Sequence, residues 1–193
     1  MTQTPSPAAP DPEYLATVRI DAAPTGKKFQ GVWLELGAQK RWVIDYRPTE
    51  IWRSFENEAV IVTGHCYEPR GQAFNQPHFK VATMRFARAP SRAVPYRSLG
   101  PEQLLRGAFV EHVWPAGTRR AGDVERQFRA DDISYGLAGG AERTSSDPVA
   151  ITARLLEPDP TYSATTGAPV VFVIAVHPHD HEPSPAPAAE PCP

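Results

Sequence analysis

Cysteine is scarce in this chain of 193 residues, since only Cys66 and Cys192 are present. Two cysteines cannot build the dense disulfide framework that stabilises small secreted domains. Long apolar runs are also lacking, because no stretch approaches the ~20 apolar residues of a membrane span. The opening residues, MTQTPSPAAPDPE, have neither the basic nor the apolar region of a secretory signal. We therefore expect a soluble, cytoplasmic protein with no membrane partner.

An excess of charge of one sign is missing as well. The chain has 20 basic and 22 acidic residues, for a formal net charge of -2. Such a balance gives the chain as a whole no electrostatic attraction for nucleic acid or for an anionic membrane. Binding to either one would have to depend on a local cluster of charge.

Recognisable catalytic motifs are absent from the sequence. It contains no glycine-rich phosphate loop, no G-x-S-x-G elbow and no HExxH pair. The neighbouring carboxylates Asp131 and Asp132 are explained by a two-residue hairpin turn. A site assembled from distant loops would leave no such pattern, but the sequence itself predicts a non-catalytic protein, with no catalytic residue and no cofactor.

Proline, in contrast, is abundant. The chain holds 22 prolines, well above the usual share of roughly 5%. Many lie near the two ends, where few apolar residues accompany them. Burial of so little apolar surface cannot offset the entropy lost on ordering a chain. We expect residues 1–13 and 179–193 to be disordered tails.

Alternating apolar and polar residues predict five strands in the first half. They are expected at about residues 14–20, 32–36, 42–46, 59–67 and 79–87. Ile51, Trp52 and Phe55 have helical spacing and predict one helical turn between the third and fourth strands. The last strand changes phase, which predicts a bulge near Ala82 and Thr83. Five strands with this helical turn resemble an OB-fold, a five-stranded Greek-key barrel, over about residues 14–88.

A second series of strands is expected after a proline- and arginine-rich linker at residues 89–102. A helical turn is expected at 103–106, followed by strands at about 108–114, 124–130, 133–137, 149–156 and 170–177. Turn residues recur between the halves, since Pro24-Thr25-Gly26 corresponds to Pro115-Ala116-Gly117. Chance matches are easy in a proline-rich all-β chain. The pattern nevertheless predicts an all-β fold of two tandem OB-like barrels, at residues 14–88 and 103–178.

Two of the expected strands are apolar on both faces, at residues 59–62 and 170–176. Such strands need cover on both sides. The two units are therefore expected to pack against each other, against a partner, or beneath their own loops.

A partner-binding surface is predicted on the second and third strands. Trp33 and Val43 fall on the face opposite the expected core, and Arg41 belongs to the same surface. Exposed apolar groups that lie side by side mark protein-binding surfaces. The sequence therefore predicts a binding or scaffolding module for a protein or peptide, although the second unit could instead cover this face.

Single-stranded nucleic acid is the alternative partner. Between residues 70 and 106 there are several basic residues but only one acid, Glu102, and aromatic residues lie among them. In such a groove arginines would follow phosphates and aromatic rings would stack on bases. The residues of this alternative are Arg70, Phe74, Lys80, Arg85 and Arg88. Several acids in the same half, and a general preference for arginine over lysine, speak against it.

A histidine-rich segment offers a candidate metal site. His177, His179 and His181 alternate along the chain, so their imidazoles would point the same way in an extended segment. The segment leads into the expected tail, which provides few groups to hold ligands in place. His65 and His78 lie within expected strands, and we interpret both as structural.

Overall fold

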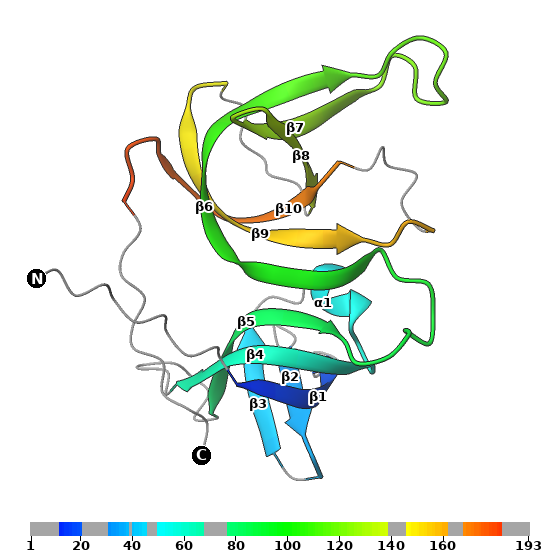
Figure 1. Cartoon of the computed structure of the whole chain (residues 1–193), viewed down its shortest axis with the longest axis vertical. Helices are drawn as coiled ribbons and strands as arrows, with labels where there is room; N and C mark the ends of the chain where they lie inside the picture. The colour runs from blue at the N-terminus through cyan, green and yellow to red at the C-terminus, as the bar shows by residue number, and fades with distance from the viewer. Residues whose placement is uncertain are drawn as a thin grey trace, which may run out of the picture.

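The computed structural model describes residues 12–20, 31–38, 40–45, 50–67, 77–138, 146–161 and 168–182. Within these ranges the protein is nearly all β, as the sequence predicts, with one short helix. The elements are β1 (Glu13–Ile20), β2 (Val32–Leu36), β3 (Lys40–Asp45), α1 (Glu50–Ser54), β4 (Ala59–Tyr67), β5 (His78–Phe86), β6 (Tyr96–Val113), β7 (Val124–Ala130), β8 (Ile133–Ala138), β9 (Val149–Pro158) and β10 (Val170–Pro178). Figure 1 shows β1 to β5 in the lower half of the molecule and β6 to β10 in the upper half.

The strands form one ten-stranded sheet in the order β3-β2-β1-β4-β5-β6-β7-β8-β10-β9. In the first half β1 pairs with both β2 and β4, while β3 and β5 pair in parallel through Val43 and His78. The other pairs in this half, β2 with β3 and β4 with β5, are antiparallel. The pairings of the five strands therefore close on themselves.

The second half repeats this order of pairing. Its first strand, β6, pairs with both β7 and β9, and β8 and β10 form the parallel pair. The remaining pairs, β7 with β8 and β9 with β10, are antiparallel. A short antiparallel contact between β5 and β6 joins the two halves.

Two clusters of buried apolar side chains fill the halves. In the first, Val18, Leu34 and Phe55 are fully buried, which explains the helical turn: α1 and the residue after it place Phe55 in the core. This cluster also includes Leu99 and Leu156 from the second half. The second cluster consists of side chains from all five strands of the second half, β6 to β10.

The predicted bulge in β5 is present. Thr63 pairs with Thr83, but its neighbour Gly64 pairs with Val81, so Ala82 is the extra residue. Gly64 has a φ of 149°, and a Cβ at this position would lie 2.0 Å from the carbonyl oxygen of Lys80. Only glycine fits so close to the bulge, because no side chain atom can approach a backbone oxygen to this distance.

The segment between the halves differs from expectation. The helical turn expected at residues 103–106 is wrong, because β6 runs without interruption from Tyr96 to Val113. Pairing with β9 along residues 96–107 holds this stretch extended, despite its proline and glycine. Residues 87–95 pack on the first half, since Val94 is fully buried and Ser91 donates two hydrogen bonds to the buried carboxylate of Glu58.

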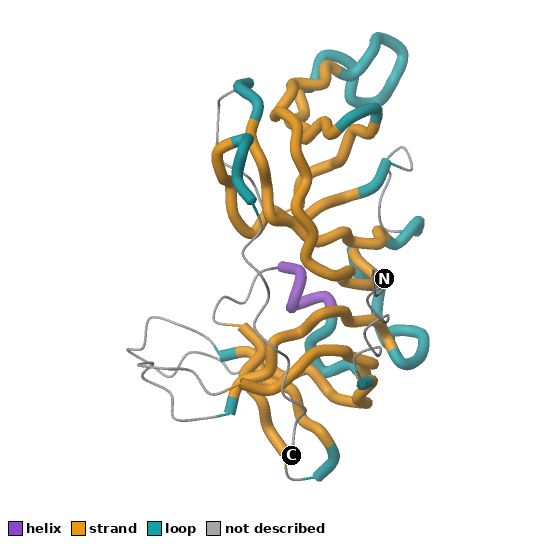
Figure 2. The backbone as a smooth tube through the Cα atoms, turned by 60° about the vertical axis from the view of Figure 1, so that its left-hand side comes forward, coloured by secondary structure: helices purple, strands orange, loops and turns teal. Residues whose placement is uncertain are grey.

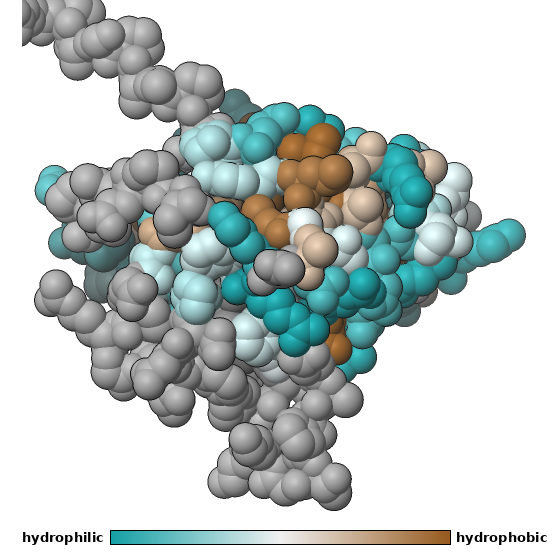
Figure 3. All heavy atoms as spheres, turned by 90° about the horizontal axis from the view of Figure 1, so that it is seen from below, coloured by the Kyte–Doolittle hydropathy of each residue, from teal (hydrophilic) through white to brown (hydrophobic). Residues whose placement is uncertain are grey.

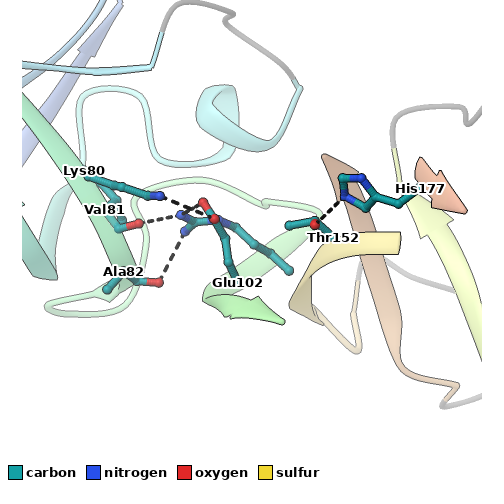
Figure 4. A network of polar contacts seen from close by, with 7 residues as sticks. Lys80, Val81, Ala82, Glu102, Thr152 and His177 are labelled. Carbon is teal, nitrogen blue, oxygen red and sulfur yellow. Dashed lines mark hydrogen bonds and ion pairs between the residues drawn. The ribbon is translucent and has the colours of Figure 1, made fainter. Parts of the chain in front are cut away.

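Arg154 of β9 connects the second half to the β5 bulge. Its guanidinium is buried and donates hydrogen bonds to the carbonyl oxygens of Val81 and Ala82. It also bonds Glu102 at 2.9 Å, and the Lys80 ammonium lies 3.6 Å from the same carboxylate (Figure 4). Burial alone would raise the pKa of Glu102, but Arg154 and Lys80 together hold that pKa below its ordinary value. The carboxylate therefore stays ionised between the halves.

The strand that is apolar on both faces in the second half, β10, is covered on both sides over its first residues, 170–172. Val171 lies in the second cluster, whereas Val170 and Phe172 pack against the first. The expectation that the two units pack against each other thus applies to β10. It does not apply in the same way to β4, where Ile61 faces away from both clusters and is half-buried.

Cys66, near the end of β4, is disulfide-bonded. The scarcity of cysteine gave no reason to expect this bond. Cys192, the other cysteine of the sequence, lies outside the described residues.

Candidate partner-binding surface

Trp33 lies on the outer face of β2, as predicted from alternation. Its neighbours Val32 and Leu34 are fully buried, while Trp33 itself is half-buried on the opposite side. In the sheet Trp33 stands between Arg19 of β1 and Val43 of β3. The backbone thus brings Val43 next to Trp33, although the Val43 side chain lies outside the part of the structure that is described.

Arg41 is brought to Trp33 through space rather than by direct pairing. The guanidinium carbon of Arg41 is 5.7 Å from the centre of the indole ring, within the range of a cation–π contact. Arg41 also pairs with Glu35 at 3.2 Å, and Arg19 pairs with the same carboxylate at 2.9 Å. The Arg19 hydrogen bond, against the opposing effect of burial and with help from Arg41, holds the pKa of Glu35 below its ordinary value. Two cations and one anion therefore lie on the same face of the sheet as the indole, and Arg41 contacts the ring.

Two more apolar residues lie on the same side of the sheet, and only Ile61 was expected there, as part of a strand that is apolar on both faces. Leu15 of β1 is 68% exposed, which is high for a leucine within a strand. It pairs with the half-buried Ile61 of β4, and Ile61 in turn pairs with Arg85 of β5. The signal was available, because Leu15 is the one large aliphatic residue on the otherwise polar face of its strand.

These residues form a surface with an apolar part and a charged border. We call it the first-half outer surface, and its members are Leu15, Arg19, Trp33, Glu35, Arg41 and Ile61. Viewed from below, at the end that the first half occupies, the molecule exposes apolar side chains among hydrophilic ones (Figure 3). Protein-binding surfaces commonly combine an apolar centre with a polar rim.

Two residues of the nucleic-acid alternative pair with acids in the described structure. Lys80 is paired with Glu102, and Arg85 lies 3.4 Å from Glu13. Arg88 is exposed in the segment after β5. Arg70 and Phe74 lie outside the described residues.

The aromatic rings expected to form a stacking platform are also placed otherwise. Phe79 is 1% exposed within the first core. Phe86 is half-buried and stacks on Phe55 with ring centres 4.7 Å apart. Phe79 therefore belongs to the protein interior, and Phe86 packs against that core while part of it stays exposed.

The histidine segment is arranged as a pair rather than as a set of three ligands. The rings of His177 and His181 stack 3.9 Å apart, and Nε2 of His177 lies 2.9 Å from the Thr152 hydroxyl (Figure 4). His179 is exposed, and its carbonyl oxygen accepts a hydrogen bond from Arg106. Across the described ranges, no group of three His, Cys, Asp or Glu side chains is placed to hold a metal ion.

Two further observations bear on the class of protein. No helix in the described part of the chain is long and apolar enough to cross a membrane. Comparison with known proteins gives no relative, because no family model, curated protein or solved structure matches the chain.

Proposed function

We propose that the protein is a non-catalytic binding or scaffolding module that engages a protein or peptide through its first-half outer surface. The observation that carries the proposal is Leu15, a leucine 68% exposed near the start of β1, where it pairs with Ile61 of β4. Exposing a leucine side chain to water is unfavourable in free energy, and a partner that covers this side chain would remove that cost. The ion pairs of Glu35 with Arg19 and Arg41 provide the polar rim.

We further propose that each half is one OB-like barrel and that the two arose by tandem duplication. The support is the pairing order, in which the first strand of each half contacts the second and fourth and the third strand pairs in parallel with the fifth. OB-folds bind their ligands on the face of the second and third strands. Trp33 and Arg41 lie on that face of the first half.

Single-stranded nucleic acid remains the second candidate partner. It is less favoured because Glu102 and Glu13 already pair with Lys80 and Arg85. Each of these ion pairs would have to open before the cation could bind a phosphate, which reduces the counterion release that drives such binding.

Affinity capture with matched variants tests the proposal. Leu15→Lys places a charge in the proposed contact, whereas Ile174→Lys changes another exposed aliphatic residue, 45% exposed on β10. A captured partner should then be purified and its affinity measured for each variant. We expect Leu15→Lys to weaken binding at least about tenfold, since burial of one leucine side chain contributes ~1.5–3 kcal/mol. Ile174→Lys should bind as the unmodified protein does.

Trp33→Ala provides a second measurement on the same surface. We expect this variant to bind the partner more weakly, while its circular dichroism spectrum and unfolding midpoint stay close to those of the unmodified protein. Equal affinity of the Leu15 and Ile174 variants would overturn the proposal. A salt-dependent mobility shift of an oligonucleotide, lost when Arg85 and Arg88 are both neutralised, would favour the nucleic-acid alternative instead.

A further inference from the structure

The hairpin of β6 and β7 projects beyond the rest of the second half (Figures 1 and 2). β6 pairs with β9 only as far as Gly107, which stands opposite Val149. From Ala108 to Val113 it pairs with β7 on one side, and no described strand pairs with its other side. We call residues 108–113 the β6 free edge. It continues the edge of β6 with which β9 pairs up to Gly107.

The direction of the backbone groups along this edge follows from the end of the hairpin. The amide of Trp114 donates to the carbonyl oxygen of Asp123 across the hairpin at 2.9 Å. Because alternate residues of a strand turn their N–H and C=O groups to opposite sides, the odd-numbered residues before Trp114 face away from β7. Phe109, Glu111 and Val113 thus present their backbone groups to the free edge.

A groove runs along this edge. Its volume is about 460 Å³, and its lining includes three consecutive β6 residues: Phe109, Val110 and Glu111. Phe109, Glu111 and Arg126 share one face of the hairpin, and Ser146 precedes β9, so the groove extends from that face to the side of β6 on which β9 lies. Arg126 of β7 and Ser146, shortly before β9, complete the lining.

Along β6 the side chains beside the groove are apolar at both ends and acidic in the middle, and Arg126 of β7 stands opposite the acid. Phe109 belongs to the second core, while Val113 and its cross-strand partner Val124 are 60% and 59% exposed. Glu111 lies between Phe109 and Val113 on the same face, and its carboxylate makes no ion pair with the described residues. An occupant of the groove would meet an apolar, an acidic and again an apolar position.

The other face of the hairpin is closed by its own contacts. The indole of Trp114 donates to Glu125 at 2.9 Å, and Arg120 lies 4.7 Å from the ring centre while pairing with the same carboxylate. His112 packs edge-on against Trp114. These contacts hold the hairpin in shape without a partner, and a preformed edge lowers the ordering cost of binding.

We propose that the β6 free edge binds an extended peptide of a partner protein, which adds to the sheet as a strand in line with β9. Strand addition gains affinity from main-chain hydrogen bonds and selectivity from alternate side chains. The peptide that fits carries a basic residue opposite Glu111, with an apolar residue two positions away on each side. This site lies in the second half and does not depend on the first-half outer surface.

A palindromic heptapeptide tests the proposal whichever way the added strand runs. The probe is fluorescein-labelled TVTKTVT, with TVTETVT as its charge-reversed counterpart, and binding is followed by fluorescence anisotropy. We expect saturable binding of TVTKTVT below about 1 mM and binding of TVTETVT weaker by about fivefold, since the contact with Glu111 becomes repulsive.

Two variants of one residue separate edge pairing from charge. Glu111→Pro removes an N–H that faces outward, so it breaks no bond to β7, and its ring obstructs an added strand. We expect Glu111→Pro to bind TVTKTVT about tenfold more weakly or worse, with an unfolding midpoint close to that of the unmodified protein. Glu111→Gln keeps the N–H and should retain most of the affinity while losing the difference between the two peptides. Lack of saturable binding, or equal binding by Glu111→Pro, would overturn the proposal.

Discussion

Replacing Arg154 with methionine removes the charged group between the two halves and keeps most of the apolar stem. The carbonyl oxygens of Val81 and Ala82 would lose their donor in a place that is largely closed to water. A hydrogen bond from a charged group contributes ~1.5–3 kcal/mol, and a buried acceptor left unpaired costs a similar amount. The bond to Glu102 adds less, because that carboxylate is 34% exposed. We therefore expect a loss of ~3–5 kcal/mol in the free energy of unfolding.

Urea unfolding followed by tryptophan fluorescence measures this loss. With a slope of about 2–3 kcal/mol per molar urea, the midpoint should fall by more than ~1 M. Arg85→Met is the matched control, since Arg85 and Glu13 are 53% and 60% exposed and such a pair contributes ~0–1 kcal/mol. If Arg154→Met lowers the midpoint no more than Arg85→Met does, the guanidinium does not join the halves as described.

Three other predictions concern the first half. Gly64→Ala should cost at least ~3 kcal/mol in urea unfolding because its Cβ would meet the Lys80 carbonyl oxygen, whereas Gly37→Ala, at a φ of 65° in open space, should cost only ~1 kcal/mol; similar losses would contradict the account of the bulge. The Ser91 hydroxyl chiefly holds the pKa of Glu58 below its ordinary value, so stability should be retained above about pH 4.3 and lost as the pH falls through the lowered pKa. Glu58→Gln should make the unfolding midpoint depend less on pH between about pH 5 and pH 3. If the midpoint of this variant changes with pH as steeply as before, the Glu58 carboxylate is not responsible. Because Cys66 is disulfide-bonded and the sequence has one other cysteine, thiol titration of the unreduced, denatured monomer should find no free thiol, and a reactive thiol would contradict the bond.

Local patterns predicted the strands well because each depends on residues close together in the sequence. Alternation placed Val32 and Leu34 inside and Trp33 outside, and the phase change in the last strand of the first half located the bulge at Ala82. The long β6 was not predicted. Its Pro101 and Gly100 are typical of a linker, and they continue the strand because the residues on either side, Leu99 and Glu102, pair with β9, more than forty residues away in the sequence.

The candidate site was predicted only in part, for the same reason. The position of Trp33 follows from alternation, but the partners of the charged residues do not. Glu13 lies 72 residues from Arg85, and Glu102 lies 52 residues from Arg154. A local count of charge therefore suggested a basic stretch, whereas the fold brings Glu13 of β1 to Arg85 and places the one local acid, Glu102, beside Lys80 and Arg154.

Among the described residues, the parallel contact between β3 and β5 in the first half consists of one residue pair, Val43 with His78, while three pairs join β8 and β10 in the second. Segments held by few backbone bonds open locally without unfolding of the whole protein. The β3–β5 seam is thus the weak point in the first half, and β3 should be released before its neighbours. Because β3 carries Arg41, that release would separate Arg41 from Trp33 and change the first-half outer surface while its core stays folded. Amide hydrogen exchange should show β3 exchanging well before β4.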